Sequence, residues 1–556
     1  MKIRSIILRL ILGLLLIIVL NGLSGLVNPR LDLTSDGRYT LSETTSSLAE
    51  QIDSPLIIDV LLDGELPPEF ARLSIEVSQF LQQLRTKNSL IKMNFVSPLE
   101  DAENRPALIA ELQSRGLTPA NVSVEEDGKT TQELVFPWAM ANYKNQTVRI
   151  PLLINKLGST TEDRINASVQ ELEYAFADAL TKLTIEEKKR IAIIKGNGQL
   201  DDIYMADLLG TLRSYYNLGV VTLDSVATNA QGTLASLNNF DMAILAKPSI
   251  AFTEEEKYVL DQFIVQGGRS LWLVDGAKIE LDSLLNETGS AIALNNDLNI
   301  NDLLFKYGVR LNPTLVNDMY CTQIVLASGE GSGSQYNPLP WVYHPMVFPG
   351  NDHPVTENIE ALRFLFSSSL DTVESPLRKT VLLRSSALSK SEAVPKLISL
   401  ELLNTPPDPA NYSGGGLPLA ILLEGPVQSA FTNRVAPVKI NDAKETGPEN
   451  AILVVADGDV IKNQLNEGRP LELGYDKWTN NFYGNKTFLL NAINYMLDEG
   501  GLVALRSRAV NIPTLDLQKV SDTRSSWQLI NIGLPLLILL AFGLTNKWWR
   551  KRIYGQ

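Results

Sequence analysis

The sequence predicts an α/β protein whose ectodomain contains a parallel-sheet domain and lies between two transmembrane helices. Four short apolar runs predict the sheet, because each ends in turn residues and helical segments separate most of them. Such runs are typical of parallel strands buried on both faces. Longer apolar segments near the two ends predict the membrane helices. With 556 residues, the chain has room for about three or four domains.

The first apolar segment predicts an N-terminal membrane anchor over residues 1–27. From Leu10 to Val27 every residue is apolar or glycine except Asn21 and Ser24, a length that is just enough to cross a bilayer as a helix. The basic start of the chain fits an anchor or a signal peptide. No small-x-small cleavage site precedes Asn28 and no lipobox cysteine follows, so an uncleaved anchor is favoured.

Residues 28–157 are predicted to form a first α/β domain. The runs 55–62 and 90–96 are strand-like, and 67–85 between them has the apolar spacing of a helix, which together make one βαβ unit. A helix near 106–115 and strands near 122, 134–138 and 147–153 complete a thioredoxin-like layer. Because the chain has no CxxC pair, redox chemistry is excluded. One long amphipathic helix over 161–189 is expected within a linking segment, 158–189.

The parallel-sheet domain is predicted over residues 190–505. Its strand runs are Ile191 to Ile194, Met242 to Ala246, Ser270 to Val274 and Ala451 to Ala456. The region from about 295 to 450 is rich in Pro, Gly and Ser and is expected to be a large insertion or a third subdomain.

The C-terminal end predicts a linker (506–526), a second membrane helix (527–549) and a basic tail (550–556). Tryptophans stand at both borders of this helix, where an aromatic belt would lie, and Lys547, Arg550, Lys551 and Arg552 are close to its end. Basic residues also flank the first anchor. The positive-inside rule therefore predicts that both termini are cytoplasmic and that the middle is periplasmic, in a bacterial inner membrane.

Charge and composition exclude several classes of function. The net charge is -14, and the region between the two apolar segments carries all 63 acidic residues, which argues against nucleic-acid binding. The single cysteine, Cys321, excludes an intramolecular disulfide and a cysteine-based zinc site. With only two histidines, His344 and His353, a histidine metal centre or triad is not expected.

Three short motifs fail the spacing that their chemistry requires. Gly128-Lys129-Thr130 resembles the end of a phosphate-binding loop, but Ser123 replaces its first glycine and acidic residues precede it, so an Asp-Gly hairpin turn is expected. The serines near 332 lack the leading glycine of a nucleophile elbow. The calcium-loop-like start at Asp297 lacks the central glycine and the closing glutamate. No catalytic residue, cofactor or metal is predicted.

Two sets of residues remain as candidate sites. Ligands of doubly wound sheets bind at the carboxyl ends of the strands, which selects Asn197, Lys247, Asp275, Asp457 and Asp459. The alternative is that these residues only form turns and helix caps. Small and polar residues inside membrane helices mark contacts with partner helices, which selects Gly13, Asn21, Gly22, Asn531 and Gly533. The alternative is that the asparagines are merely hydrated at the interface.

Several segments resemble one known family. The run Arg30 to Ser42 after the anchor resembles the start of GldG, the gliding-associated ABC transporter component. Further similar segments are Phe252 to Glu256, Gln266 to Arg269, Leu422 to Gly425 and Gly484 to Asn491. The resemblance implies a middle domain with a glutamine-amidotransferase-like fold, in which neither the nucleophilic cysteine nor its histidine is found here.

The same resemblance implies a non-catalytic accessory or substrate-binding subunit, acting with a separate permease and ATPase in gliding motility or envelope transport. An envelope protein or a glycan is a possible ligand. Two alternatives remain open: a membrane-anchored hydrolase that uses carboxylates such as Asp457 and Asp459, and a purely structural envelope protein.

Overall fold

The computed structural model describes residues 13, 40–99, 104–126, 129–154, 156–328, 335–350, 352–497, 505 and 517–554. The chain divides into two compact units, Met1–Ala509 and Val510–Gln556. The predicted anchor, with Asn21 and Gly22, lies outside the described residues, apart from Gly13, which is helical.

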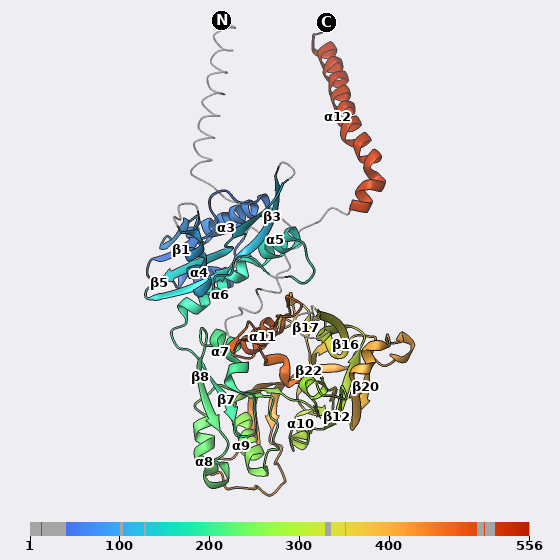
Figure 1. Ribbon diagram of the computed structural model, residues 1–556. Coiled ribbons are helices and arrows are strands. Elements are labelled where there is room, and N and C mark those ends of the chain that lie inside the picture. Colours follow the sequence, from blue (N-terminus) through green and yellow to red (C-terminus); the bar gives the residue numbers. More distant parts are fainter. Residues whose placement is uncertain are drawn as a thin grey trace. The chain divides into compact units, whose positions relative to one another are not determined.

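The N-terminal part is an α/β layer around a four-stranded sheet of order β2-β1-β5-β6 (Figure 1). The predicted βαβ unit is present, because β1 and β2 are parallel and α3 joins them. Strands β5 and β6 add to the sheet in antiparallel fashion. The elements of this part are α2 (Glu43–Glu50), β1 (Leu56–Val60), α3 (Pro68–Lys87), β2 (Ile91–Phe95), α4 (Arg105–Ser114), β3 (Ala120–Glu126), β4 (Lys129–Val135), β5 (Trp138–Tyr143) and β6 (Gln146–Pro151).

The helix expected over 161–189 is instead two helices, α5 (Thr161–Gln170) and α6 (Leu172–Thr184). Thr160 caps α5 through a capping box with Asp163, which fixes its start. The backbone of Glu171 leaves the regular helical conformation and separates the two helices. The apolar faces still pack as predicted, since Phe176 of α6 lies 5.2 Å, centre to centre, from the ring of Phe80 in α3.

The central part contains a seven-stranded sheet of order β19-β22-β23-β10-β9-β7-β8 (Figure 1). Its strands are β7 (Arg190–Lys195), β8 (Asn217–Thr222), β9 (Met242–Ala246), β10 (Arg269–Leu273), β19 (Arg378–Arg384), β22 (Pro418–Gln428) and β23 (Thr446–Val455). The five strands from β8 to β23 are parallel, and β22 and β19 continue the sheet in antiparallel fashion. The run predicted as a late strand, 451–456, lies in this sheet, where residues 451–455 form the second half of β23.

Helices cover both faces of the sheet and give it two apolar cores. One core joins the sheet to α8 (Val226–Leu237), α9 (Glu254–Val265) and α10 (Asn301–Tyr307). The other joins it to α7 (Ala206–Leu212) and α11 (Asn485–Leu497). Every residue of β9 is buried, as a strand covered on both faces requires.

The region expected to be an insertion, 295–450, is only partly one. Strands β19 and β22 from this region belong to the seven-stranded sheet. Most of the rest, together with β11 and β12 from just before it, forms a β-rich region of small sheets: β11 (Ala277–Lys278), β12 (Ser290–Asn295) and β21 (Lys396–Ser399); β13 (Val309–Leu311) and β18 (Leu370–Thr372); β14 (Thr314–Asp318) and β20 (Ser389–Ala393); β15 (Cys321–Ser328), β16 (Gln335–Val347) and β17 (Leu362–Arg363).

Short elements complete the central part. These are the hairpins β24 (Leu465–Asn466) with β25 (Arg469–Pro470) and β26 (Tyr475–Asp476) with β27 (Asn481–Phe482), and the 3-10 helices η1 (Asp202–Tyr204), η2 (Leu281–Leu284), η4 (Leu400–Asn404), η5 (Pro409–Asn411) and η6 (Gly458–Ile461).

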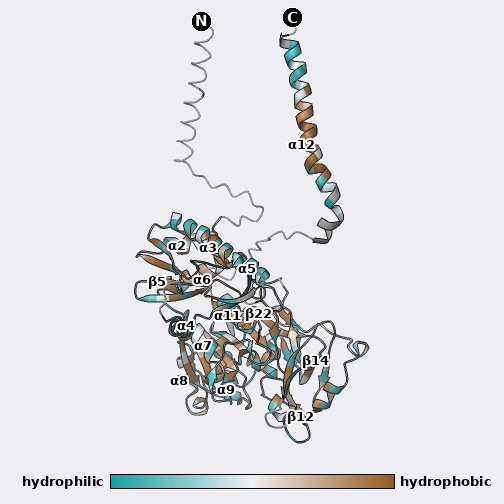
Figure 2. Ribbon diagram, turned by 45° about the horizontal axis from the view of Figure 1, so that its top comes forward, coloured by the Kyte–Doolittle hydropathy of each residue, from teal (hydrophilic) through white to brown (hydrophobic). Residues whose placement is uncertain are grey.

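The second unit contains one long helix, α12 (Leu517–Tyr554). Within it, Ser526–Arg552 is long and apolar enough to cross a membrane, with a mean hydropathy of 1.9. Its middle is apolar and its two ends are polar (Figure 2). The described helix therefore begins ten residues before the predicted membrane segment and includes the end of the expected linker.

Candidate functional site

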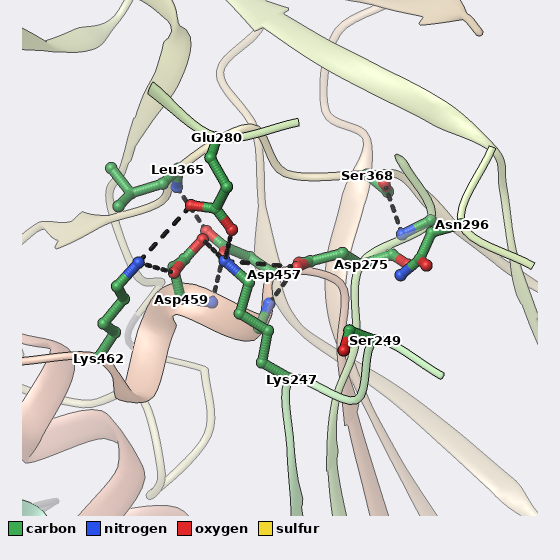
Figure 3. Close-up of polar contacts among 12 residues, drawn as sticks. Lys247, Ser249, Asp275, Glu280, Asn296, Leu365, Ser368, Asp457, Asp459 and Lys462 are labelled. Carbon is green, nitrogen blue, oxygen red and sulfur yellow. Dashed lines mark hydrogen bonds and ion pairs between the residues drawn. The ribbon is translucent and has the colours of Figure 1, made fainter. Parts of the chain in front are cut away.

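Lys247 is the centre of a cluster of charged side chains (Figure 3). The cluster lies where the parallel strands of the seven-stranded sheet, below called the large sheet, have their carboxyl ends. Its Nζ lies 2.5 Å from Asp459 Oδ2, 2.5 Å from Glu280 Oε1 and 3.8 Å from Asp275 Oδ2. A second cation, Lys462, lies 3.2 Å from Asp459 Oδ1. The cluster therefore brings together two lysines and at least three carboxylates.

The strand order explains why these residues meet. Lys247 follows β9, Asp275 follows β10, and Asp457 and Asp459 follow β23, which are three adjacent parallel strands. The carboxyl ends of parallel strands lie at one edge of a sheet. Four of the five residues predicted at this edge are thus close together.

Backbone conformation also brings the loops into contact. Lys247 has φ +49, a left-handed conformation that is uncommon for a residue with a side chain. At Gly458 a Cβ atom would lie 2.5 Å from Lys247 Cγ, so only glycine allows this approach. The backbone N–H of Gly458 also donates a hydrogen bond of 2.6 Å to Asp275 Oδ1.

Asp457 connects the sheet edge to the β-rich region through residues 364–369, which we call the strap. Asp457 caps η6, since its Oδ1 accepts a hydrogen bond from Asp459 N at 2.7 Å. Its Oδ2 accepts from Leu365 N in the strap at 2.5 Å. Ser368 of the strap donates its N–H to Ala456 O and accepts from Gly276 N through its Oγ. The strap thus covers the edge at which ligands of doubly wound sheets bind.

Burial and neighbouring charges set the protonation of the carboxyl groups. Burial raises the pKa of Asp457 well above its usual range, and the charges of Asp459 and Asp275 raise it further. Burial likewise raises the pKa of Asp275 to about 7, although Lys247 opposes the shift. The pKa of Asp459 is lowered, because Lys247 and Lys462 outweigh the effect of its burial. The surroundings therefore favour the neutral form of Asp457 and the charged form of Asp459.

The same charges keep the two lysines protonated. Burial alone would lower the pKa of Lys247, but Asp459, Asp275 and Glu280 outweigh it and raise the pKa. For Lys462 too, Asp459 outweighs burial and raises the pKa. A lysine that acts as a nucleophile or base needs a lowered pKa, so these side chains are held as ion-pair partners.

Two members of the cluster were not predicted. Glu280 reaches Lys247 from the loop after β11, and no local pattern marks it. Lys462 lies three residues after Asp459, and this i, i+3 pairing of opposite charges is a signal that the sequence does contain.

Asn197 does not belong to the cluster. Its side chain is buried, and its Nδ2 donates to Glu256 Oε2 at 2.9 Å at the start of α9. Its backbone O accepts from Ser249 N and Ile250 N. Asn197 thus lies after β7, the strand next to β9, and joins two loops at this edge of the sheet without contacting the Lys247 cluster.

Other candidates from the sequence occupy structural positions. Strands β3 and β4 pair up to Glu126 opposite Lys129, which is the hairpin expected in place of a phosphate loop. Cys321 begins β15, where burial and the nearby Asp318 charge raise the pKa of its thiol to about 11. Among the described residues, no group of three or more His, Cys, Asp or Glu side chains could hold a metal ion.

The predicted contact residues Asn531 and Gly533 lie on α12. Both are in the segment long enough to cross a membrane, and nothing in the described part of the chain lies within 4 Å of a Cβ atom built on Gly533.

Comparisons with known proteins identify the central part. A family model described as an ABC-type uncharacterized transport system matches residues 188–492. A domain of unknown function matches residues 35–142. No curated relative matches the chain.

Among solved structures, the mmIFT52 N-terminal domain is similar to 56% of this chain and 98% of its own, with 13% identity and a TM-score of 0.32. A putative ThuA-like protein from Parabacteroides merdae is similar to 59% of this chain and 94% of its own, with 11% identity and a TM-score of 0.27. The family model covers more than half of the sequence and includes every residue of the Lys247 cluster. The chain belongs to the ABC-type uncharacterized transport system family.

Proposed function

We propose that this chain is a non-catalytic subunit of an ABC transporter complex, anchored in the inner membrane with a large periplasmic domain. It acts with a separate permease and ATPase in gliding motility or another envelope process. The observation that carries the proposal is the family match over residues 188–492. The family suggests an accessory component of a transport system, and the helix Ser526–Arg552 offers a means of staying in the membrane beside a permease.

The state of the carboxylates supports a non-catalytic role. Asp459 is bound by two lysines, and both oxygens of Asp457 accept backbone hydrogen bonds. A general acid or base needs access to substrate within hydrogen-bond reach, whereas the strap covers Asp457 and its side chain is fully buried. These contacts favour a framework that joins the sheet to the β-rich region.

Purification in mild detergent tests the proposal. The full chain is expected to bring down a permease and an ATPase, identified by mass spectrometry. A purely structural envelope protein would bring down neither, and that result would refute the transporter assignment.

Substitutions in α12 test whether the helix contacts the permease. Asn531→Leu and Gly533→Leu change the surface expected to pack against it, and recovery of the permease is expected to fall about tenfold, since such contacts contribute about 1–2 kcal/mol at most. Leu540→Ile in the same helix is the matched control and is expected to leave recovery unchanged. Unchanged recovery with both Asn531→Leu and Gly533→Leu would make α12 a simple tether.

A further inference from the structure

Four basic residues gather at the C-terminal end of α12. They follow the apolar middle of the helix, and this end is polar in Figure 2. The residues, which we call the basic end, are Lys547, Arg550, Lys551 and Arg552. The last acidic residue of the sequence, Asp522, lies on the same helix about 25 positions, or about 38 Å, before Lys547. No carboxylate side chain of α12 therefore neutralises these charges.

The helix dipole does not by itself account for the basic end. The partial negative charge at the C-terminus of a helix stabilises cations in the last turn, and the effect falls off beyond that turn. The last turn of α12 contains Lys551 and Arg552, whereas Lys547 and Arg550 precede it. Two of the four charges thus lie outside the reach of the dipole.

Helical spacing concentrates the positive charge. Lys547, Arg550 and Lys551 are spaced i, i+3 and i+4, so they share one face of α12. Like charges at this spacing repel one another. An anionic partner that lies against this face relieves the repulsion of all three side chains at once.

The basic side chains lean back toward the apolar segment. In an α-helix every Cα–Cβ bond tilts toward the N-terminus, which at this end of α12 is the direction of the membrane segment. Arg552 shows the tilt, because its Cζ lies 4.8 Å from the centre of the Trp548 ring, one turn earlier.

The depth of these residues matches that of lipid headgroups. Leu544 is the last aliphatic residue before the basic end, and Lys547 to Arg552 lie about 4.5–12 Å beyond it along the axis. The headgroup layer on each side of a bilayer is about 5–8 Å thick. Trp548 and Trp549 lie at the same level, where interfacial tryptophans are enriched. When Ser526–Arg552 crosses a bilayer, the basic side chains therefore reach the lipid phosphates.

We propose that the basic end of α12 binds anionic phospholipids in the leaflet at that end of the helix. Their headgroups carry a net negative charge, and their phosphate oxygens accept paired N–H bonds from arginine. A zwitterionic headgroup has the same phosphate, but its own cation cancels the net charge. Each basic residue near an anionic membrane surface strengthens the attraction about fivefold. The four charges together therefore favour anionic over zwitterionic lipid.

This inference rests on the proposed function in one respect, because α12 must cross the membrane. It needs neither the permease nor the ATPase. It also concerns a different part of α12 from Asn531 and Gly533, so the lipid contact and the permease contact have separate tests.

Native mass spectrometry of the full chain in mild detergent, titrated with phosphatidylglycerol or phosphatidylcholine of the same acyl chains, tests the proposal. Phosphatidylglycerol is expected to bind at least tenfold more tightly. Arg550→Gln and Lys551→Gln are each expected to weaken its binding about fivefold and to leave phosphatidylcholine binding unchanged. Each variant keeps three basic residues at this end, so insertion is expected to be retained. Lys551→Arg keeps the charge and is expected to retain binding.

Arg524→Gln is the matched control. It removes one exposed charge just before the other end of the segment Ser526–Arg552. There the tilt of the side chain points away from the bilayer, so the affinity for phosphatidylglycerol is expected to stay the same.

Three results would overturn the proposal: equal affinity for the two lipids, an unchanged preference in both Arg550→Gln and Lys551→Gln, or an equal loss in Arg524→Gln. Loss of permease recovery in Arg550→Gln with an unchanged lipid preference would also overturn it and assign the basic end to a protein partner. Release of the chain from membranes by alkaline carbonate would overturn the anchoring and this inference together. A chain that stays in the membrane and shows no lipid preference overturns this inference alone.

Discussion

Asp275 is expected to make the stability of the large sheet depend on pH. Its pKa is raised to about 7 in the folded chain, mainly by burial, against a usual value of 3.8. Between about pH 4 and pH 7 the folded state therefore holds a proton that the unfolded state has lost. The stabilisation from this group is complete below the unfolded pKa and is lost as the pH rises through the folded pKa.

The size of the effect follows from the difference between the two pKa values. The gap is about three units, and each unit corresponds to about 1.36 kcal/mol, giving an upper limit of about 4 kcal/mol. Coupling to Asp459 and Lys247 spreads the proton over several groups, so about 2–4 kcal/mol is expected between pH 5 and pH 8.

The substitution Asp275→Asn tests this reasoning. Asparagine keeps the size of the side chain and an oxygen that can accept from Gly458 N, but it does not titrate. Hydrogen exchange, corrected for the intrinsic effect of pH on exchange rates, gives the free energy of opening of β10 and β23. Between pH 5 and pH 8 this free energy is expected to fall by about 2–4 kcal/mol less in the variant than in the parent chain. Asp282→Asn, an exposed position in η2, is the control and should follow the parent chain. Equal slopes for Asp275→Asn and the parent would refute the shifted pKa.

Three further predictions concern the cluster, the thiol and the topology. Lys247→Met leaves Asp459 buried beside only Lys462, and the free energy of unfolding in urea is expected to fall by about 3–5 kcal/mol. Adding Asp459→Asn should recover part of this loss. If the effects of the two substitutions are fully additive, the pairing of Lys247 with Asp459 is contradicted. The Cys321 thiol, whose pKa is raised from 9.0 to about 11, is expected to react with a maleimide at pH 7.5 roughly 100-fold more slowly than an unperturbed thiol, since the thiolate reacts. A normal rate would contradict the burial of this site. In a Cys321→Ser background, a cysteine at Lys129 should be labelled by an impermeant reagent in intact spheroplasts and one at Gln556 should not, and the reverse pattern would contradict the proposed topology.

The pattern of apolar residues in the sequence predicted those strands for which burial on both faces is the main requirement. Strands β9, β10 and β23 are buried on both faces, so their sequences are continuous apolar runs. Strand β8 was missed, because it lies at the edge of the sheet, has a single buried residue, Val221, and contains Gly219. Strand β22 was assigned to an insertion, because the Pro, Gly and Ser content of the surrounding region concealed its apolar run.

Only those residues of the candidate site that lie at the ends of predicted strands could be predicted from the sequence. The convergence of Lys247, Asp275 and Asp459 follows from the parallel order of three strands. The contribution of Glu280 depends on the path of a loop, and the cover provided by the strap depends on the packing of the β-rich region. The rings of Tyr336 and Trp478 stack although more than a hundred residues separate them in the chain, and no spacing rule connects two such positions.

The order of strands in the large sheet has a consequence for synthesis on the ribosome. Strand β10 pairs with β23, yet roughly 170 residues separate them in the chain. At about 5–20 residues per second, β10 waits roughly 10–35 s for its neighbour. During that time the Ser270 to Leu273 edge, including the large indole of Trp272, is an unpaired apolar strand edge of the kind that aggregates. The nascent chain therefore has an interval in which a chaperone or the translocation machinery is needed to protect this edge.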